Sequence, residues 1–412
     1  MANVSSSNGL EKRPKLRFPG FDEPWNTALL SDYFVKSTKK NSDGMISNVI
    51  CNSAKQGLIP QREYFDKDIA NSDNTNGYYI IESNDFVYNP RKSADAPYGP
   101  ISSYQYPEAG IVSPLYLCFR AKREINPLYF EWYFRSSTWH RYIYMSGDSG
   151  ARHDRVSIKD DVFFAMPINV PSAKEQEKIS LFLDVIERRI ETQRTLVETL
   201  KKYKRGVISV LLSSRNNPYY SSATWKEVDL CDVASGFEYG MNAAATVYDG
   251  SHKYIRITDI DDNSHLYSQD VPVSPEGQVD EKYRVRENDI LFARTGASVG
   301  KSYRYQRSDG DLYYAGFLIR IHVNSDVNCG YVFQNTLTEA YRRWVLLESA
   351  RSGQPGINAE QYKQYRFLLP PLELQNKIST LATNLDNLIC KEENLLSQIE
   401  QVKIALLQRL FI

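Results

Sequence analysis

A glycine-rich heptapeptide in the second half of the chain, Gly296–Ser302, has the composition of a phosphate-binding loop. Such a loop holds phosphate when its first glycine stands five residues before the Gly-Lys pair and a helix follows. Here that position is Thr295, and Ser302–Arg307 has the pattern of a strand. The spacing therefore argues against a nucleotide site and predicts a tight turn. Two interpretations of the turn remain open. Either Arg294, Thr295 and Lys301 contact a nucleic-acid backbone or base edge, or the turn is a plain hairpin with solvated basic residues.

A second segment, Asn126–Tyr129, is similar to the NPPY tetrapeptide with which adenine methyltransferases hold a flipped base. Leu128 replaces the second proline, and no glycine-rich cofactor loop precedes the segment, so a helix start with Pro in its first turn is the better interpretation. The histidines show neither metal-ligand spacing nor a neighbouring nucleophile; they are His140, His153, His252, His265 and His322. No D…E-x-K cluster marks a nuclease. The sequence therefore predicts no catalytic residue and no metal site.

Basic residues on predicted loops are the candidates for contact with nucleic acid. Long cationic side chains bind phosphate, and arginine can also bind guanine through two hydrogen bonds in the major groove. The alternative for each is that the charge is only solvated. The predicted DNA-binding residues are Arg91, Lys92, Arg152, Arg155, Arg294, Thr295, Lys301 and Arg351. Further candidates for contact with sugars or bases, with interior packing as the alternative, are Tyr98, Tyr104 and Tyr239.

Length and composition predict a globular protein of two to four domains, of which two is the simplest count. The chain has 412 residues, 42% hydrophobic and 24% charged, and a domain takes roughly 100 to 200 residues. The 50 Lys and Arg residues balance 50 Asp and Glu residues. A net charge of zero argues against a nonspecific polyanion binder, but it leaves room for a specific one with a local basic face.

Two features predict a cytosolic protein. No apolar run is long enough to cross a membrane, and the first residues carry no apolar signal segment. The five cysteines are scattered, without a C-x-x-C pair or a histidine at ligand spacing. We expect all five to be buried free thiols.

The chain contains an internal repeat. Pro171–Ser180 (PSAKEQEKIS) returns as Pro370–Ser379 (PPLELQNKIS), an offset of 199 residues. The start of each copy repeats too, because WNTALLSDYF from Trp25 matches WKEVDLCDVA from Trp225 at an offset of 200. One unit of about 200 residues therefore occurs twice.

Landmarks survive in the divergent middle of each copy. Short buried strands are predicted at Asn84–Asn89 and Asn288–Ala293, and one aromatic-rich amphipathic helix each at Leu128–Ile143 and Gly330–Val345. A glycine-rich turn, ending at Ser157 in one copy and Asn358 in the other, is expected to join this helix directly to the last strand of its domain.

The end of each unit has heptad spacing. In the first copy the apolar residues are Ile179, Leu183, Ile186, Ile190, Val197, Leu200, Val207 and Leu211; in the second they are Ile378, Ala382, Leu385, Ile389, Leu396, Ile399, Leu406 and Leu410. Polar residues interrupt both copies at the same two places, namely Gln193 and Lys204, then Glu392 and Lys403. This pattern predicts two long coiled-coil helices, with polar positions that fix the register. Two unrelated surface helices are the alternative.

Connectivity limits how these helices can be arranged. One helix joins the two domains and the other ends the chain, so antiparallel packing would place one domain at each end and relate the halves by a pseudo-twofold axis. A helix of about 40 residues is roughly 60 Å long. Such a rod suits a duplex with two separated half-sites, which DNA offers once per turn of about 34 Å.

Repeated globular and helical segments of this size resemble the DNA-specificity subunits of type I restriction-modification systems. The resemblance covers nearly the whole chain, from about Phe18 to Ile412. Glu287–Lys301 (ENDILFARTGASVGK) is similar to a stretch typical of their recognition domains, and Pro370–Ile378 to the start of their helical regions. In the first copy, Asn84–Ser93 followed by Gly110–Phe119 is also similar. The first domain lacks the TGASVGK turn.

The resemblance implies a non-catalytic subunit with two α/β target-recognition domains in tandem. Each domain would bind one half of a bipartite double-stranded DNA target. The helices would set the spacing and dock two methyltransferase subunits, with restriction and translocation subunits completing the complex. The chain itself would need no cofactor, whereas its partners would use S-adenosylmethionine, ATP and Mg²⁺. Its role would be host defence in the cytoplasm.

The expected limits are a polar extension at 1–17, recognition domains at 18–170 and 222–369, and spacer helices at 171–213 and 370–412. Two other classes remain as alternatives: a stand-alone DNA methyltransferase or fused nuclease, and a protein-interaction scaffold that uses the coiled coil without DNA. The target bases, the spacer length, the methylated adenines and the presence of a restriction subunit do not follow from the sequence.

Overall fold

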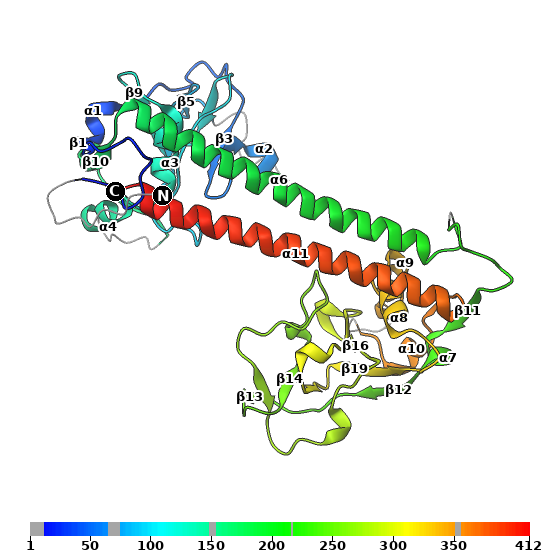
Figure 1. Ribbon diagram of the computed structural model, residues 1–412. Coiled ribbons are helices and arrows are strands. Elements are labelled where there is room, and N and C mark those ends of the chain that lie inside the picture. Colours follow the sequence, from blue (N-terminus) through cyan, green and yellow to red (C-terminus); the bar gives the residue numbers. More distant parts are fainter. Residues whose placement is uncertain (1–11, 65–74, 148–153, 216, 351–355) are drawn as a thin grey trace. The chain divides into compact units, whose positions relative to one another are not determined.

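The computed structural model describes residues 12–64, 75–147, 154–215, 217–350 and 356–412. Its contacts divide the chain into two compact units (Figure 1). Unit 1 comprises Met1–Gln193 together with Leu395–Ile412, and unit 2 comprises Arg194–Asn394. Both limits fall within long helices, α6 (Ala173–Leu211) and α11 (Leu372–Leu410). The C-terminal segment therefore belongs to the unit that the N-terminal half builds.

Unit 1 is organised around a four-stranded antiparallel sheet in the order β2-β9-β6-β7. These strands are β2 (Phe34–Lys36), β9 (Leu117–Ala121), β6 (Phe86–Tyr88) and β7 (Ile101–Ser103). Antiparallel pairs are β1 (Asn26–Leu29) with β10 (Pro167–Val170), β3 (Ile50–Ser53) with β4 (Gly57–Pro60), and β5 (Tyr79–Ile81) with β8 (Gly110–Val112). The short helices are α1 (Leu30–Tyr33), α2 (Gln61–Tyr64), α3 (Pro127–Arg135), α4 (His140–Ser146) and α5 (Asp160–Phe164).

Unit 2 repeats this plan with a sheet in the order β12-β19-β16-β17. The strands are β12 (Ala234–Tyr239), β19 (Leu318–Val323), β16 (Asp289–Ala293) and β17 (Ser302–Arg304). Pairs are β11 (Lys226–Asp229) with β20 (Arg366–Leu369), β13 (Ala245–Val247) with β15 (Val273–Pro275), and the parallel pair β14 (Lys253–Ile255) with β18 (Leu312–Tyr314). Its helices are α7 (Leu230–Val233), α8 (Cys329–Asn335), α9 (Glu339–Ser349) and α10 (Ala359–Lys363).

The two sheets correspond strand for strand, which confirms two similar mixed α/β domains in tandem. Matching local contacts explain why. Asp32 and Asp232 each accept a hydrogen bond from the backbone N–H three residues earlier, at 2.7 and 2.8 Å. Asn126 and Asn328 cap α3 and α8 by accepting from Tyr129 N at 3.1 Å and Tyr331 N at 2.9 Å. The predicted strands at Asn84–Asn89 and Asn288–Ala293 are the buried β6 and β16.

The prediction of one amphipathic helix in the middle of each copy is wrong, because two helices stand in its place. Serine and threonine side chains end the first helix by binding its last carbonyls. The hydroxyl of Ser136 donates to Tyr133 O at 2.6 Å, and that of Thr336 donates to Phe333 O at 2.7 Å. Thr338 then caps α9 by accepting from Tyr341 N at 3.2 Å.

The predicted direct connection from the glycine-rich turn to the last strand is also wrong. A further short helix precedes the last strand in each unit, α5 before β10 and α10 before β20. In α10 the side chain of Asn358 accepts from Gln361 N at 2.9 Å, so a polar N-cap starts the helix directly after the turn.

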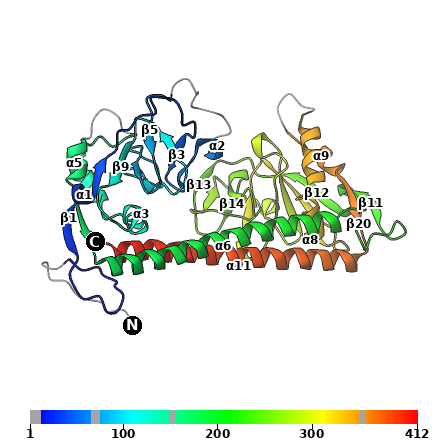
Figure 2. The same ribbon diagram turned by 90° about the horizontal axis from the view of Figure 1, so that it is seen from above.

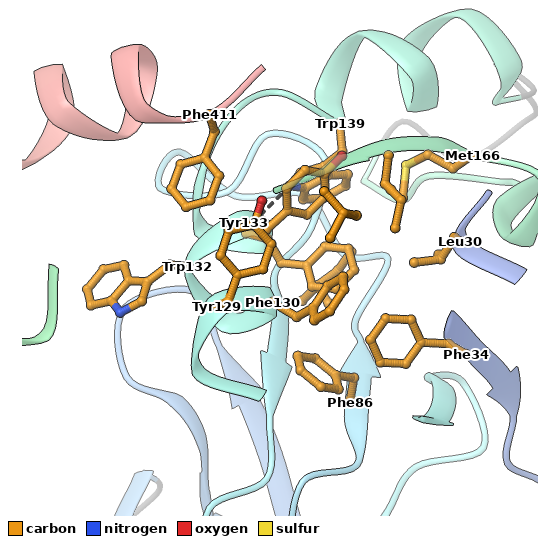
Figure 3. Packing of buried hydrophobic residues seen from close by; sticks show 14 of the residues in the cluster. Leu30, Phe34, Phe86, Tyr129, Phe130, Trp132, Tyr133, Trp139, Met166 and Phe411 are labelled. Atoms are coloured by element: carbon orange, nitrogen blue, oxygen red, sulfur yellow. Dashed lines mark hydrogen bonds between the residues drawn. The ribbon is translucent and has the colours of Figure 1, made fainter. Parts of the chain in front are cut away.

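An aromatic core fills unit 1, and the C-terminal end of the chain completes it (Figure 3). Phe34 contacts Phe86, Phe119 and Phe130 with ring centroids 5.0 to 5.3 Å apart. Phe411, at 2% exposure, packs its ring 5.7 Å from that of Tyr129. A buried phenylalanine contributes about 1.5 to 3 kcal/mol. The core of unit 1 therefore depends on a segment from the far end of the sequence.

The long helices α6 and α11 pack antiparallel. In unit 1, Glu187 in the first half of α6 pairs with Lys403 near the end of α11 at 2.8 Å. In unit 2, Lys204 near the end of α6 pairs with Asp386 near the start of α11 at 2.5 Å, and both views show these segments side by side (Figures 1 and 2). Lys204 and Lys403 occupy the polar positions that the heptad pattern contains, and Gln193 is fully buried.

The cysteines are free, as expected, but the prediction that all five are buried is wrong. Cys118 and Cys329 are buried, whereas Cys231 and Cys390 are exposed and Cys51 is half-buried. Burial raises the pKa of Cys118 and of Cys329 to about 12. Cys390 lies on the outer side of α11, where the heptad pattern leaves a solvent position.

In the part of the chain that the structure describes, none of the helices is both long and apolar enough to span a membrane.

We predict that thiol reagents distinguish these cysteines. At pH 8, Cys231 and Cys390 should react with Ellman's reagent at the rate of a free thiol. Cys118 and Cys329 should react only after unfolding, because a buried thiol with a pKa of about 12 is almost never ionised. Serine variants of each cysteine assign the signals, and rapid labelling of Cys118 in the folded protein would contradict the structure.

Candidate nucleic-acid interface

In unit 1 the backbone brings three of the predicted DNA-binding residues together. The segment after β6 pairs with the segment before α5, because Pro90 O accepts from Val156 N and Asp154 O accepts from Lys92 N, both at 2.8 Å. Arg91 faces Arg155 across this pairing. Arg91 and Lys92 are exposed and Arg155 is half-buried. Arg152 lies outside the described residues.

Unit 2 repeats this pairing in the segment after β16. Ile357 N donates to Arg294 O at 2.9 Å, and Thr295 faces Gly356. Thr295 therefore corresponds to Arg91. Along the sequence, Thr295 follows Asp289 by as many residues as Arg91 follows Asp85. Arg351 lies outside the described residues. In both units, the segment after the central strand, β6 or β16, thus pairs with the segment that precedes the next short helix, α5 or α10.

Arg294 is held in place with unused hydrogen-bond donors. Its guanidinium lies 4.9 Å from the centroid of the Tyr239 ring, and its buried Nε atom has no hydrogen-bond partner. The Tyr239 hydroxyl accepts from Ala359 N at 3.2 Å, which fixes the ring. Within the described residues no carboxylate pairs with Arg294. A stacked guanidinium with free donors is suited to a phosphate or a base edge.

Lys301 is already bound within the fold. Its ammonium donates to Ile260 O at 2.9 Å and to Ile257 O at 3.5 Å, and it also pairs with Asp262. Only 10% of the side chain is exposed. The structure therefore gives Lys301 a role in holding the neighbouring turn, while its contact with DNA stays a prediction.

The backbone of the turn between β16 and β17 favours glycine at two positions. Gly296 and Gly300 have φ of +74° and +85°, and a Cβ atom on Gly300 would lie 2.6 Å from the methyl groups of Val345. Gly300 N donates to Ala293 O at 2.9 Å, and the strand β17 follows. The predicted tight turn and strand are confirmed: the turn contains one 3₁₀ helix, Gly296–Ser298, and the strand β17 follows Lys301 where a phosphate-binding loop would have an α-helix.

Sequence reasoning missed two aspartates that hold these strands. Asn84 and Asn288 have φ of 68° and 66°, and the next residues, Asp85 and Asp289, each accept a backbone N–H at 2.8 Å. Arg120 binds Asp85 through two hydrogen bonds of 2.6 Å. In unit 2, burial raises the pKa of Asp289 even though His322 binds it at 2.8 Å. The Asn-Asp pair, which occurs at the same place in both copies of the repeat, could have pointed to these aspartates.

Of the three candidate tyrosines, only Tyr239 lies at the candidate interface. Tyr104 is fully buried, and its hydroxyl donates to Glu108 O at 2.8 Å, so it packs in the interior. Tyr98 is half-buried with its ring 4.9 Å from that of His140. Asn126 acts as a helix cap, which supports the helix interpretation of the Asn126–Tyr129 segment. The described residues contain no cluster of three potential metal ligands.

Comparisons with known proteins identify what the chain is similar to. Residues 223–401 match the family described as the type I restriction modification DNA specificity domain. The specificity subunit of the type I restriction enzyme StySPI of Salmonella potsdam is 23% identical over 311 residues, which cover 71% of this chain and 66% of that protein. The alignment thus spans just under two thirds of that relative.

Solved structures share the fold. A chain from a structure of complex assembly and conformational transition of the type I R-M system has a TM-score of 0.58 at 14% identity, over 95% of this chain and 98% of that one. The S subunit of the type I restriction-modification system from M. genitalium has a TM-score of 0.57 at 13% identity, over 97% and 99%. Both comparisons extend across the two units and both long helices.

We predict that Lys301 stabilises unit 2. Lys301→Met should lower the free energy of unfolding by about 1 to 3 kcal/mol, because two carbonyls lose their donor in a largely buried place. Urea denaturation followed by circular dichroism measures this change. The matched control is Lys391→Met on the exposed side of α11, which should stay within about 0.5 kcal/mol. Equal stabilities of the two variants would show that the Lys301 contacts are not needed.

Proposed function

We propose that this chain, which belongs to the type I restriction-modification specificity subunits, binds a bipartite double-stranded DNA target with one half-site on each recognition domain. Subunits of this family are non-catalytic components that recognise DNA. One observation carries the proposal for two half-sites. The same backbone pairing brings arginine to matching segments in both units, Arg91 and Arg155 in unit 1 and Arg294 in unit 2.

Affinity and specificity have different sources in this proposal. Neutralisation of phosphates by Arg91 and Lys92 in unit 1 and by Arg294 in unit 2 supplies affinity, since these basic side chains lie in the segments that follow β6 and β16. Contacts to base edges supply specificity, because phosphates carry no sequence information. Arg294 suits either role. Arg152, Arg155, Thr295, Lys301 and Arg351 complete the proposed DNA-binding set. Zero net charge keeps the binding of random DNA weak.

The helix pair sets the spacing and docks partner subunits. Docking is supported by apolar side chains that α6 and α11 leave in solvent. Val185 is 63% exposed, Leu196 41% and Tyr203 58% on α6, and Val402 is 55% exposed on α11. Exposed aliphatic and aromatic groups on a long helix are typical of a protein interface. We propose two methyltransferase subunits as the occupants, joined by restriction and translocation subunits in the restricting complex.

In this proposal, all cofactors bind to the partner subunits. The methyltransferase subunits would bind S-adenosylmethionine, and the translocating subunits would use ATP and Mg²⁺. The chain itself would contribute recognition only, in the cytoplasm where it meets the host's DNA.

We predict that the positions of methylated adenines in the host's DNA identify the target sequence. Sequencing that detects N6-methyladenine, in cells with and without this gene, should reveal one motif that depends on the gene. That motif should consist of two short specific halves and a fixed spacer. Restoring the gene is the control. An unchanged methylation pattern, together with no salt-dependent shift of duplex DNA by the purified chain, would favour a scaffold without DNA.

We predict that longer helices move the half-sites apart. A seven-residue insertion into α6 after Gln193, with a matching insertion into α11 after Glu392, adds about 10 Å to each helix. This length corresponds to about three base pairs of duplex. The preferred spacer, measured by the methylated motif, should lengthen while both halves stay unchanged. A spacer that does not change would refute the role of the helices in spacing.

A further inference from the structure

A line of charged contacts in unit 1 runs from the recognition sheet to both long helices. It begins at β7, where Ser103 N donates to Glu131 Oε2 at 2.5 Å. Arg135 Nε on α3 donates to Glu131 Oε1 at 2.9 Å. Arg135 Nη1 lies 3.8 Å from Glu187 Oε1 on α6, and Lys403 Nζ on α11 lies 2.8 Å from Glu187 Oε2. The carboxylates of Glu131 and Glu187 thus join four elements, β7, α3, α6 and α11.

Packing confines the two carboxylates of this line, while the Arg135 side chain between them is 38% exposed. The carboxylate of Glu131 is only 9% exposed, and its two oxygens bind Ser103 and Arg135 separately. The Arg135 guanidinium lies 4.9 Å from the centroid of the Trp132 ring, which is itself 2% exposed. Glu187 and Lys403 are 25% and 22% exposed. The side chains are thus confined by packing on the domain side and by the helix pair on the other side.

Unit 2 keeps the helix pairing but lacks the connection to its domain. Lys204 and Asp386 correspond to Lys403 and Glu187 at the offset of 199 residues, and they pair at 2.5 Å. However, Phe333 on α8 and Leu337 just after it stand where α3 has Glu131 and Arg135.

In place of a carboxylate, the Phe333 ring lies 5.7 Å from the guanidinium of Arg304 on β17. Leu337 packs against the apolar core. The charged connection from recognition sheet to helices is therefore present in unit 1 and absent from the equivalent position of unit 2.

We propose that Glu131, Arg135 and Glu187 are positioning residues that hold the direction of recognition domain 1 on the helix pair, and so determine how strictly one spacer length is selected. This inference rests on the proposed function. A spacer changed by one base pair moves a half-site along the duplex and also rotates it about the axis. A domain that is free to tilt can follow that rotation, whereas a domain tied to both helices cannot.

The apolar core by itself leaves this freedom, because apolar packing is not directional. The hydrogen bonds of Glu131 and the bond from Lys403 to Glu187 prescribe both a distance and an angle, and the ion pair between Arg135 and Glu187 at 3.8 Å joins these two sets. The network therefore contributes orientation more than stability.

The test compares two variants that differ only in the connection to the domain. Glu187→Gln removes the carboxylate that joins Lys403 to Arg135, and Asp386→Asn removes its counterpart, which joins nothing but Lys204. Each is assembled with its methyltransferase partners and bound to duplexes that carry the native spacer or a spacer one base pair longer or shorter. The quantity of interest is the ratio of the affinities for native and altered spacers.

We expect Glu187→Gln to lower this ratio about two- to fivefold, the factor that one partly exposed ion pair is worth. Asp386→Asn should leave the ratio unchanged while lowering the thermal midpoint as much as Glu187→Gln does. Arg135→Gln should reproduce Glu187→Gln, and the two together should have no additional effect, since both interrupt one network.

Equal ratios for Glu187→Gln and Asp386→Asn would overturn the inference. A wild-type complex that shows no preference among spacers would instead overturn the proposed function, and with it this inference. Loss of binding to every duplex by Arg135→Gln alone would assign Arg135 to folding rather than to positioning.

Discussion

Neither unit builds its core from one continuous stretch of the chain. In unit 1, Leu407, Leu410 and Phe411 from the end of the chain join a core that the first 190 residues build. In unit 2, Ile208 and Leu212 from α6 join Ile378 and Ala382 from α11. Each domain is therefore completed by two helices of opposite direction. Because hydrophobic burial dominates folding energy, the packing of α6 on α11 is a condition for both domains as well as a connection between them.

Polar residues then decide which of the possible helix pairings forms. Apolar heptads alone allow several registers, and a shift by seven residues would bury nearly the same area. Lys204 with Asp386 and Lys403 with Glu187 are satisfied together only in the antiparallel register that the structure contains. Each pair is partly exposed and contributes little stability. Their value lies in specifying the register of α6 against α11 within each unit.

The sequence predicted what local pattern determines and missed what tertiary contacts determine. The heptads, the repeat and the helix start in Asn126–Tyr129 could be read directly, because periodicity and helix-start signals act over a few residues. The break between α3 and α4 was missed because its aromatic residues satisfy one helical pattern, and only the hydroxyl of Ser136 ends the helix. The partners of Lys301, Ile257 and Ile260, lie about forty residues away, so no spacing could show that its charge is already used. Burial also depends on tertiary contacts, so the sequence did not reveal that Cys231 and Cys390 are exposed.

The two units have diverged in an informative way. Contacts that build the fold are the same in both, down to the aspartates at the strand starts and the asparagines at the helix starts. Residues at the candidate interface differ in type at matching positions, as at Arg91 and Thr295. A symmetric dimer would read two identical half-sites, because its interface residues are identical. Two copies within one chain are free to differ there while their cores stay alike. The divergence at these matching positions is what the asymmetric target of the proposed function requires.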